Sequence, residues 1–185
     1  DFGMTVWKNG LGDFEVRVGG AWVANGVRQS LIGYVQGDEV LHEGVEVVFG
    51  YPGGAILAVY DALLNYPIHH VLVRHEQSAV HLADGFYRVS GRPLAVYTSI
   101  GPGAANTVVG LATAFVDSTA ALVLCGDVHT YMFGRGVLQE VERHHWANLA
   151  RIFEPVTKRY WQVTRPDQLP TVMNRAFTAM LGGRR

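Results

Sequence analysis

Short apolar runs alternate with longer amphipathic stretches from residue 41 onward. Unbroken apolar runs are typical of strands that are buried on both faces. Four such runs are found at 45–50, 69–73, 94–99 and 120–126. The stretches between and after them predict helices over about 55–65, 78–90, 101–117, 144–153 and 165–181. A further strand is possible at 159–163 (RYWQV).

This alternation predicts an α/β fold, a doubly wound and mostly parallel sheet with helices on both faces. Ligands of such folds bind beyond the carboxyl ends of the strands. Three segments meet at that edge in the predicted fold: GYPGG (50–54), RHEQ (74–77) and TSIGPGAAN (98–106). The sequence therefore predicts one site built from three distant segments.

Two of the predicted helices contain residues that predict a buried face, an ion pair or a helix end. In the helix over 78–90, the apolar spacing predicts a single buried face, made of Ala79, Leu82, Ala83, Phe86 and Val89. Asp84 and Arg88 are spaced to form an ion pair, and Gly91 is placed to end the helix. Asp167 is a candidate cap for the helix over 165–181.

The first forty residues give a weaker pattern. DFEVRV (13–18) alternates polar and apolar residues, as a short strand does. Apolar residues then recur every four positions, which favours a helix, although Gly26 and Gly33 weaken that interpretation. The four positions are Val23, Val27, Leu31 and Val35.

Composition narrows the class of protein. The chain has 185 residues, with 15 basic and 16 acidic side chains and a formal net charge of −1. No basic field or polybasic segment favours nucleic acid or a membrane surface as partner. The most apolar stretch, 111–126, is interrupted by Asp117 and Ser118, and no signal-peptide pattern is present. With Cys125 as its single cysteine, the sequence predicts a cytoplasmic protein in which Cys125 belongs to the core.

Glu76 is the most informative candidate for chemistry. The stretch HEQSAVH (75–81) resembles a zinc-binding helix, but the second histidine would have to stand at position 79, which is Ala79. We therefore expect no metal site there. A first-turn glutamate can be a capping residue only. Its place at the ligand edge favours a role in acid–base chemistry.

The glycine turns leave alternatives open. Gly101 and Gly103 after a strand, followed by Asp127 after the next one, resemble part of a dinucleotide fingerprint. The same glycines are equally consistent with a tight turn. Pro52 and Gly53 likewise predict a turn that permits close backbone approach.

Four segments in the same order resemble the N-terminal pyrimidine-binding domain of thiamine-diphosphate-dependent enzymes of the acetolactate synthase and pyruvate oxidase group. These segments are EGVEVVFGYPGGAILAVYDAL (43–63), RHEQSAVHLADGFYRVSGRPLAV (74–96), GPGAANTVVGLATAFVDS (101–118) and FEPVTKRYWQV (153–163). A looser match is GRGVLQE (134–140). The resemblance implies thiamine diphosphate as cofactor and a 2-oxo acid as substrate.

The resemblance also implies roles for single residues. Glu76 matches the glutamate that hydrogen-bonds N1′ of the cofactor's aminopyrimidine and so activates the cofactor. Gln139 matches a glutamine near the active site. Residues matching segments that border the pyrimidine and the dimer interface are Pro52, Gly53, Gly103 and Asn106.

The family's diphosphate-binding motif, Gly-Asp-Gly, does not occur in this chain. The resemblance therefore implies that Mg²⁺ and the diphosphate are held by the diphosphate-binding domain of a partner chain, in a homodimer or higher oligomer. We expect residues 1–40 to be a poorly matched segment and 41–185 to be the pyrimidine-binding domain, truncated at its C-terminus. Whether the chain is a fragment or a separate subunit stays open, and we expect it to be inactive alone. A non-catalytic dimerisation module is a further alternative.

Overall fold

The structure is a computed structural model. It describes residues 4–8, 14–18, 21–23, 33–36, 39–42, 45–64, 66–140 and 149–183, the first five ranges as backbone strands only. Within these residues no helix has the length and apolar character needed to cross a membrane.

A four-stranded parallel sheet lies at the centre of the structure, and it confirms the predicted α/β class. The strand order is β7-β6-β8-β9. The bounds are β6 (Val47–Gly50), β7 (His69–Leu72), β8 (Leu94–Thr98) and β9 (Ala121–Cys125). All three neighbouring pairs are parallel. Every residue of β8 is buried, as the unbroken apolar run predicts, whereas β9 at the edge is half-buried throughout.

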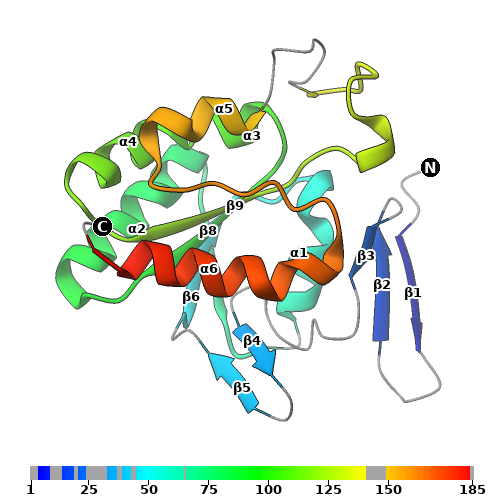
Figure 1. Cartoon of the computed structure of the whole chain (residues 1–185), viewed down its shortest axis with the longest axis horizontal. Helices are drawn as coiled ribbons and strands as arrows, with labels where there is room; N and C mark the ends of the chain where they lie inside the picture. The colour runs from blue at the N-terminus through cyan, green and yellow to red at the C-terminus, as the bar shows by residue number, and fades with distance from the viewer. Residues whose placement is uncertain are drawn as a thin grey trace.

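Helices cover both faces of this sheet. They are α1 (Leu57–Leu63, after the 3-10 turn η2, Gly54–Ile56), α2 (Glu76–Ser90), α3 (Pro102–Ala105), α4 (Val108–Val116), α5 (Leu149–Phe153) and α6 (Leu169–Leu181). Since β7 and β8 flank β6, right-handed crossovers place α1 on one face and α2 with α4 on the other. In Figure 1, β9 lies between α6 on one side and α4 and α5 on the other.

Three short 3-10 turns and the N-terminal strands complete the described elements. The turns are η3 (Thr130–Met132), η4 (Glu154–Val156) and η5 (Pro166–Gln168). The strands are β1 (Met4–Lys8), β2 (Phe14–Val18), β3 (Ala21–Val23), β4 (Gly33–Gln36) and β5 (Glu39–His42). They form two antiparallel sheets, β1-β2-β3 and β4-β5, apart from the parallel sheet (Figure 1).

The N-terminal region tests two predictions. The strand predicted within 13–18 is confirmed by β2. The helix predicted from the four-residue spacing is wrong where it can be examined, because Val23 ends β3 and Val35 lies in β4. Val27 and Leu31 lie outside the described residues. A repeat interrupted by two glycines is weak evidence for a helix.

The buried face of α2 differs from the prediction. The buried residues are Ala79, Val80, Ala83, Asp84 and Tyr87. Leu82 and Val89 face outward instead, and Val89 is 91% exposed. The face is rotated because α4 packs on α2, and the Gly110 backbone lies directly over Val80.

The predicted ion pair of α2 and its predicted end at Gly91 are confirmed. Arg88 donates to both carboxylate oxygens of Asp84 at 3.1 Å, and Asp84 also accepts a bond from Thr119, two residues before β9. Arg88 reaches Asp117 as well. Gly91 ends the helix in a left-handed conformation with φ 68°. The bonds of Asp84 and Arg88 hold the turn between α4 and β9 against α2.

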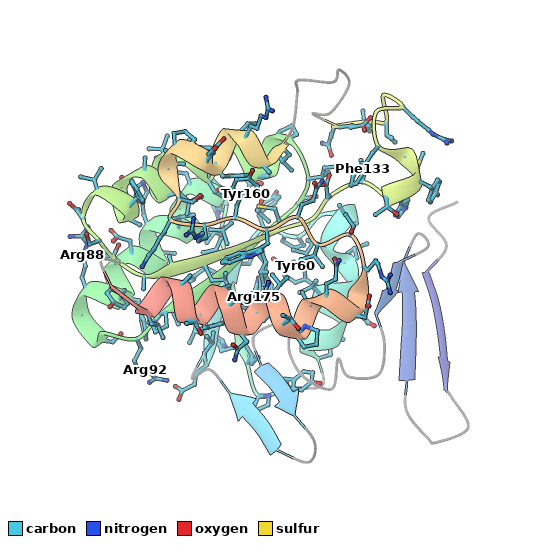
Figure 2. All side chains as sticks on the ribbon, in the orientation of Figure 1. Tyr60, Arg88, Arg92, Phe133, Tyr160 and Arg175 are labelled. Atoms are coloured by element: carbon cyan, nitrogen blue, oxygen red, sulfur yellow. The ribbon has the colours of Figure 1, made fainter. Side chains whose placement is uncertain are left out.

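Two predictions near the C-terminus are wrong. Residues 159–163 form no strand, because no strand of the described residues pairs with them, and Tyr160 and Trp161 are exposed. Asp167 does not cap α6: it lies in η5 and pairs with Arg165, and the cap position is Gln168 without a side-chain bond. Figure 2 shows Tyr160 on the extended connection that leads to α6.

Candidate active site at the carboxyl edge of the sheet

The candidate site lies where the four parallel strands end. Because the strands are parallel, the segments that follow them meet at one edge. Contacts between these segments are close: a Cβ built at Gly126, after β9, would lie 2.8 Å from the carbonyl oxygen of Ala55, after β6. The predicted convergence of distant segments is thus observed.

Glu76 is the first residue of α2 and is half-buried. His75 caps the helix, with Nδ1 accepting the Gln77 N–H at 3.2 Å. His81 contacts the side chain of the same residue, Gln77, at 3.3 Å, so both histidines of HEQSAVH are bonded to Gln77. The start of a 15-residue helix is a favourable place for a carboxylate, because the backbone N–H groups there point toward it.

Asn106 holds the Glu76 carboxylate. Its side-chain amide donates to Oε2 of Glu76 at 2.9 Å, across 30 residues of sequence. Sequence reasoning placed both residues at this edge but did not predict the bond between them. The bond fixes one carboxylate oxygen and orients the other.

The other oxygen of Glu76 lies beside Gly103. A Cβ built at Gly103 would lie 3.0 Å from Oε1 of Glu76 and 3.0 Å from Oγ1 of Thr98. Thr98 is fully buried and cannot move aside. A side chain at position 103 would therefore crowd the carboxylate or the Thr98 hydroxyl.

Gly53 plays a comparable steric role one strand away. A Cβ at Gly53 would overlap the side chain of Ser99, so the YPGG turn and the TSIGPG segment are in direct contact. Pro52 precedes Gly53 and is exposed. Ser99 and Thr98 were missed as site residues, because a small polar residue at a strand end carries little signal alone.

Gln139 reaches the edge through its backbone. A Cβ at Gly101 would overlap the carbonyl oxygen of Gln139, and the Gln139 side chain is exposed. Glu140, which sequence reasoning did not single out, is buried and accepts bonds from the backbone of Gly134 and two further residues of its loop.

Asp127 and Cys125 lie at the end of β9. Burial raises the pKa of the Asp127 carboxyl, the Glu140 charge raises it further, and bonds from the Val128 N–H and Gln162 oppose the shift. Burial, with the Asp127 charge adding to it, raises the pKa of the Cys125 thiol to about 12. Cys125 stays protonated at neutral pH, which agrees with a core residue rather than a nucleophile.

Residues 38–146 match the sequence model of a protein family described as "Thiamine pyrophosphate enzyme, N-terminal TPP binding domain". The chain belongs to this family. The name implies thiamine pyrophosphate, that is thiamine diphosphate, as the cofactor that the family binds.

Curated relatives of this thiamine-diphosphate-binding domain are acetolactate synthase large subunits. The chain is 42% identical over 142 residues to a probable acetolactate synthase large subunit of Methanocaldococcus jannaschii, covering 77% of this chain and 23% of the relative. It is 43% identical over 146 residues to the acetolactate synthase isozyme 3 large subunit of Escherichia coli, covering 78% and 24%. The chain therefore spans about a quarter of the length of these relatives. It is a thiamine-diphosphate-binding N-terminal domain similar to that of acetolactate synthase large subunits.

The residues at the sheet edge have the chemistry to meet part of this cofactor. Oε1 of Glu76 can exchange a hydrogen bond with a ring nitrogen, and Gly103 beside it has no side chain to crowd this oxygen. A diphosphate with its metal ion would also need side chains that coordinate the metal. Within the described residues, no group of three or more His, Cys, Asp or Glu side chains is placed to hold a metal ion.

Proposed function

We propose that the chain binds the aminopyrimidine of thiamine diphosphate in an acetolactate synthase-like enzyme that decarboxylates and ligates 2-oxo acids. The observation that carries the proposal is the arrangement of Glu76, whose Oε2 accepts a bond from Asn106 while Oε1 lies against the side-chain-free Gly103. The names of the relatives support the type of reaction.

Glu76 is the catalytic residue of this proposal. Its Oε1 would give or take a proton at N1′ of a bound pyrimidine, while Asn106 keeps Oε2 occupied. When bound, the cofactor supplies an electron sink for decarboxylation. Glu76 acts on the cofactor and needs no contact with the substrate.

The remaining residues shape the pocket in this proposal. Gly103 leaves the carboxylate uncrowded, and Gly53, which follows Pro52, forms the neighbouring wall through its contact with Ser99. Gln139 lies at the far end, against Gly101. None of these side chains has to move a proton, so their roles are steric and orienting.

The diphosphate and Mg²⁺ are assigned to the diphosphate-binding domain of a partner chain, in a homodimer or larger assembly. The outer face of α2 and α4 offers an apolar surface for such a partner. Its exposed residues are Leu82, Val89, Val109, Phe115 and Val116. Covering large apolar side chains is the usual source of association energy. The division into residues 1–40 and 41–185 and the cytoplasmic location stay predictions.

The dinucleotide alternative is less well supported. After Gly101 the chain forms only the four-residue α3, and a new helix begins at Val108. The dinucleotide fingerprint opens a continuous helix whose N-terminus faces the pyrophosphate. Asp127 is bonded to the neighbouring Val128 N–H at 2.8 Å, as in a local turn.

Titration calorimetry tests the proposal. We expect weak binding of thiamine diphosphate with Mg²⁺ to this chain alone and strong binding when a diphosphate-binding chain is added. Tight binding to the chain alone would contradict the shared site, whereas binding of NADH would favour the dinucleotide alternative. The same mixture analysed by gel filtration distinguishes a non-catalytic dimerisation module, which would associate without binding cofactor.

A further inference from the structure

The loop 134–140 is closed by its own last side chain. The Glu140 carboxylate accepts bonds from the backbone N–H groups of Gly134, Gly136 (2.7 Å) and Val137 (3.0 Å), and Glu140 is only 7% exposed. We call this set of three bonds the Glu140 clasp. Charge-assisted bonds of this kind are stronger than neutral ones, and breaking them leaves the buried carboxylate unpaired.

The clasp holds an unfavourable backbone conformation next to it. Gln139 has φ 66°, and Ser118 is the only other non-glycine residue with positive φ among the described residues. A residue with a Cβ adopts this conformation only where its surroundings impose it. Glu140 follows directly, and its own N–H is bonded to the Val137 carbonyl at 3.1 Å, so the turn is fixed from both sides of Gln139.

In this conformation Gln139 contacts the segment that carries the site. Its carbonyl oxygen lies 2.1 Å from where a Cβ of Gly101 would be, so the two backbones are in van der Waals contact. Gly101 is the residue directly before α3. Figure 2 shows Phe133, at the start of the loop, on the opposite side of the molecule from Arg88 on α2.

Helix α3 then connects this contact to Glu76. Gly103 in α3 lies beside Oε1 of Glu76, and Asn106 at its end donates to Oε2. With only four residues, α3 is too short to bend between these points. A shift of Gly101 therefore moves both neighbours of the carboxylate.

From these contacts we infer that Glu140 is a positioning residue for Glu76. The clasp fixes Gln139, Gln139 supports Gly101, and α3 sets Gly103 and Asn106 against the carboxylate. The functional meaning of this coupling rests on the proposed role of Glu76.

The test is Glu140→Gln in the 185-residue chain, followed by amide hydrogen exchange and ¹H–¹⁵N spectra. A glutamine has the same length, but its amide nitrogen cannot accept a backbone N–H. We expect exchange to become at least about tenfold faster at Gly134, because the one oxygen that glutamine keeps can still accept the N–H groups of Gly136 and Val137. We also expect the signals of Gly103 and of the Asn106 side-chain amide to shift.

The matched control is Asp84→Asn, which weakens another buried acid, bonded to Thr119 and Arg88. It is expected to lower stability and leave the Gly103 and Asn106 signals in place. Wild-type signals at these two positions in Glu140→Gln, with faster exchange in the loop, would overturn the inference.

A second variant tests the backbone conformation of Gln139 directly. Gln139→Gly adopts the same φ without strain, so adding it to Glu140→Gln should restore part of the Asn106 shift. No restoration would contradict the role assigned to Gln139. These readouts need no cofactor, so a failure of thiamine diphosphate to bind would reject the proposed function and leave the coupling itself standing.

Discussion

Replacing Gly103 with alanine should disable the site without unfolding the protein. The new methyl group would lie 3.0 Å from Oε1 of Glu76 and 3.0 Å from Oγ1 of Thr98, both closer than normal van der Waals contact. Thr98 is fully buried and fixed, whereas Glu76 is half-buried and can rotate. We therefore expect the carboxylate to turn away and the bond to Asn106 to break.

The cost in stability can be estimated from these contacts. Overpacking costs about 1–3 kcal/mol and the lost hydrogen bond about 1 kcal/mol, while alanine gains about 1 kcal/mol over glycine in a helix. The net loss is about 1–3 kcal/mol, or a fall in melting temperature of roughly 2–12 °C. Losing one hydrogen bond from a charged group to the cofactor should weaken cofactor binding by about 10–100-fold.

Circular dichroism melting of the chain and titration of thiamine diphosphate into its complex with a diphosphate-binding chain measure the two effects. Gly85→Ala is the matched control. Gly85 is an exposed helical glycine with no atom within 4 Å of the added Cβ, so melting should rise by about 2–4 °C. Unchanged cofactor affinity in Gly103→Ala would refute the steric role of Gly103.

Three further changes test the surrounding structure. Gly110→Ala should lower stability by about 1–2 kcal/mol in denaturant titration, since its Cβ would lie 2.6 Å from Cβ of the buried Val80; equal or higher stability would contradict the α2–α4 packing. Tyr97→Phe should raise stability by about 1 kcal/mol, because the fully buried hydroxyl has no partner among the described residues; a loss would show that the hydroxyl has a partner. A carboxyl with a raised folded-state pKa stabilises the fold most at low pH, and this contribution is lost as pH rises through that pKa. Asp127→Asn should therefore raise the melting temperature at neutral pH and lose this advantage as pH falls below about 4; a gain independent of pH would contradict the buried carboxylate.

The sequence predicted the parallel sheet well because its strands are unbroken apolar runs. The four strands are observed within the predicted ranges, and their shared carboxyl edge follows from their being parallel. The capping glycine at 91 and the pair Asp84–Arg88 were predictable since both depend on residues close in sequence.

The predictions that were wrong concern features set by contacts between residues that are far apart in sequence. The buried face of α2 is set by α4, which packs against it, and a periodicity within one helix does not contain that information. Residues 159–163 have strand-like composition, but a strand also needs a pairing neighbour. The Asn106–Glu76 bond and the Glu140 clasp were likewise not predicted, because they depend on the exact geometry of loops.

The central claim is that Glu76 activates thiamine diphosphate. In the complete enzyme, Glu76→Gln should slow exchange of the cofactor's C2 proton at least about 100-fold, measured by NMR after acid quench, because a glutamine cannot share a proton with N1′. The control Glu154→Gln changes an exposed glutamate in η4 and should leave exchange unchanged. Wild-type exchange in Glu76→Gln would contradict the account.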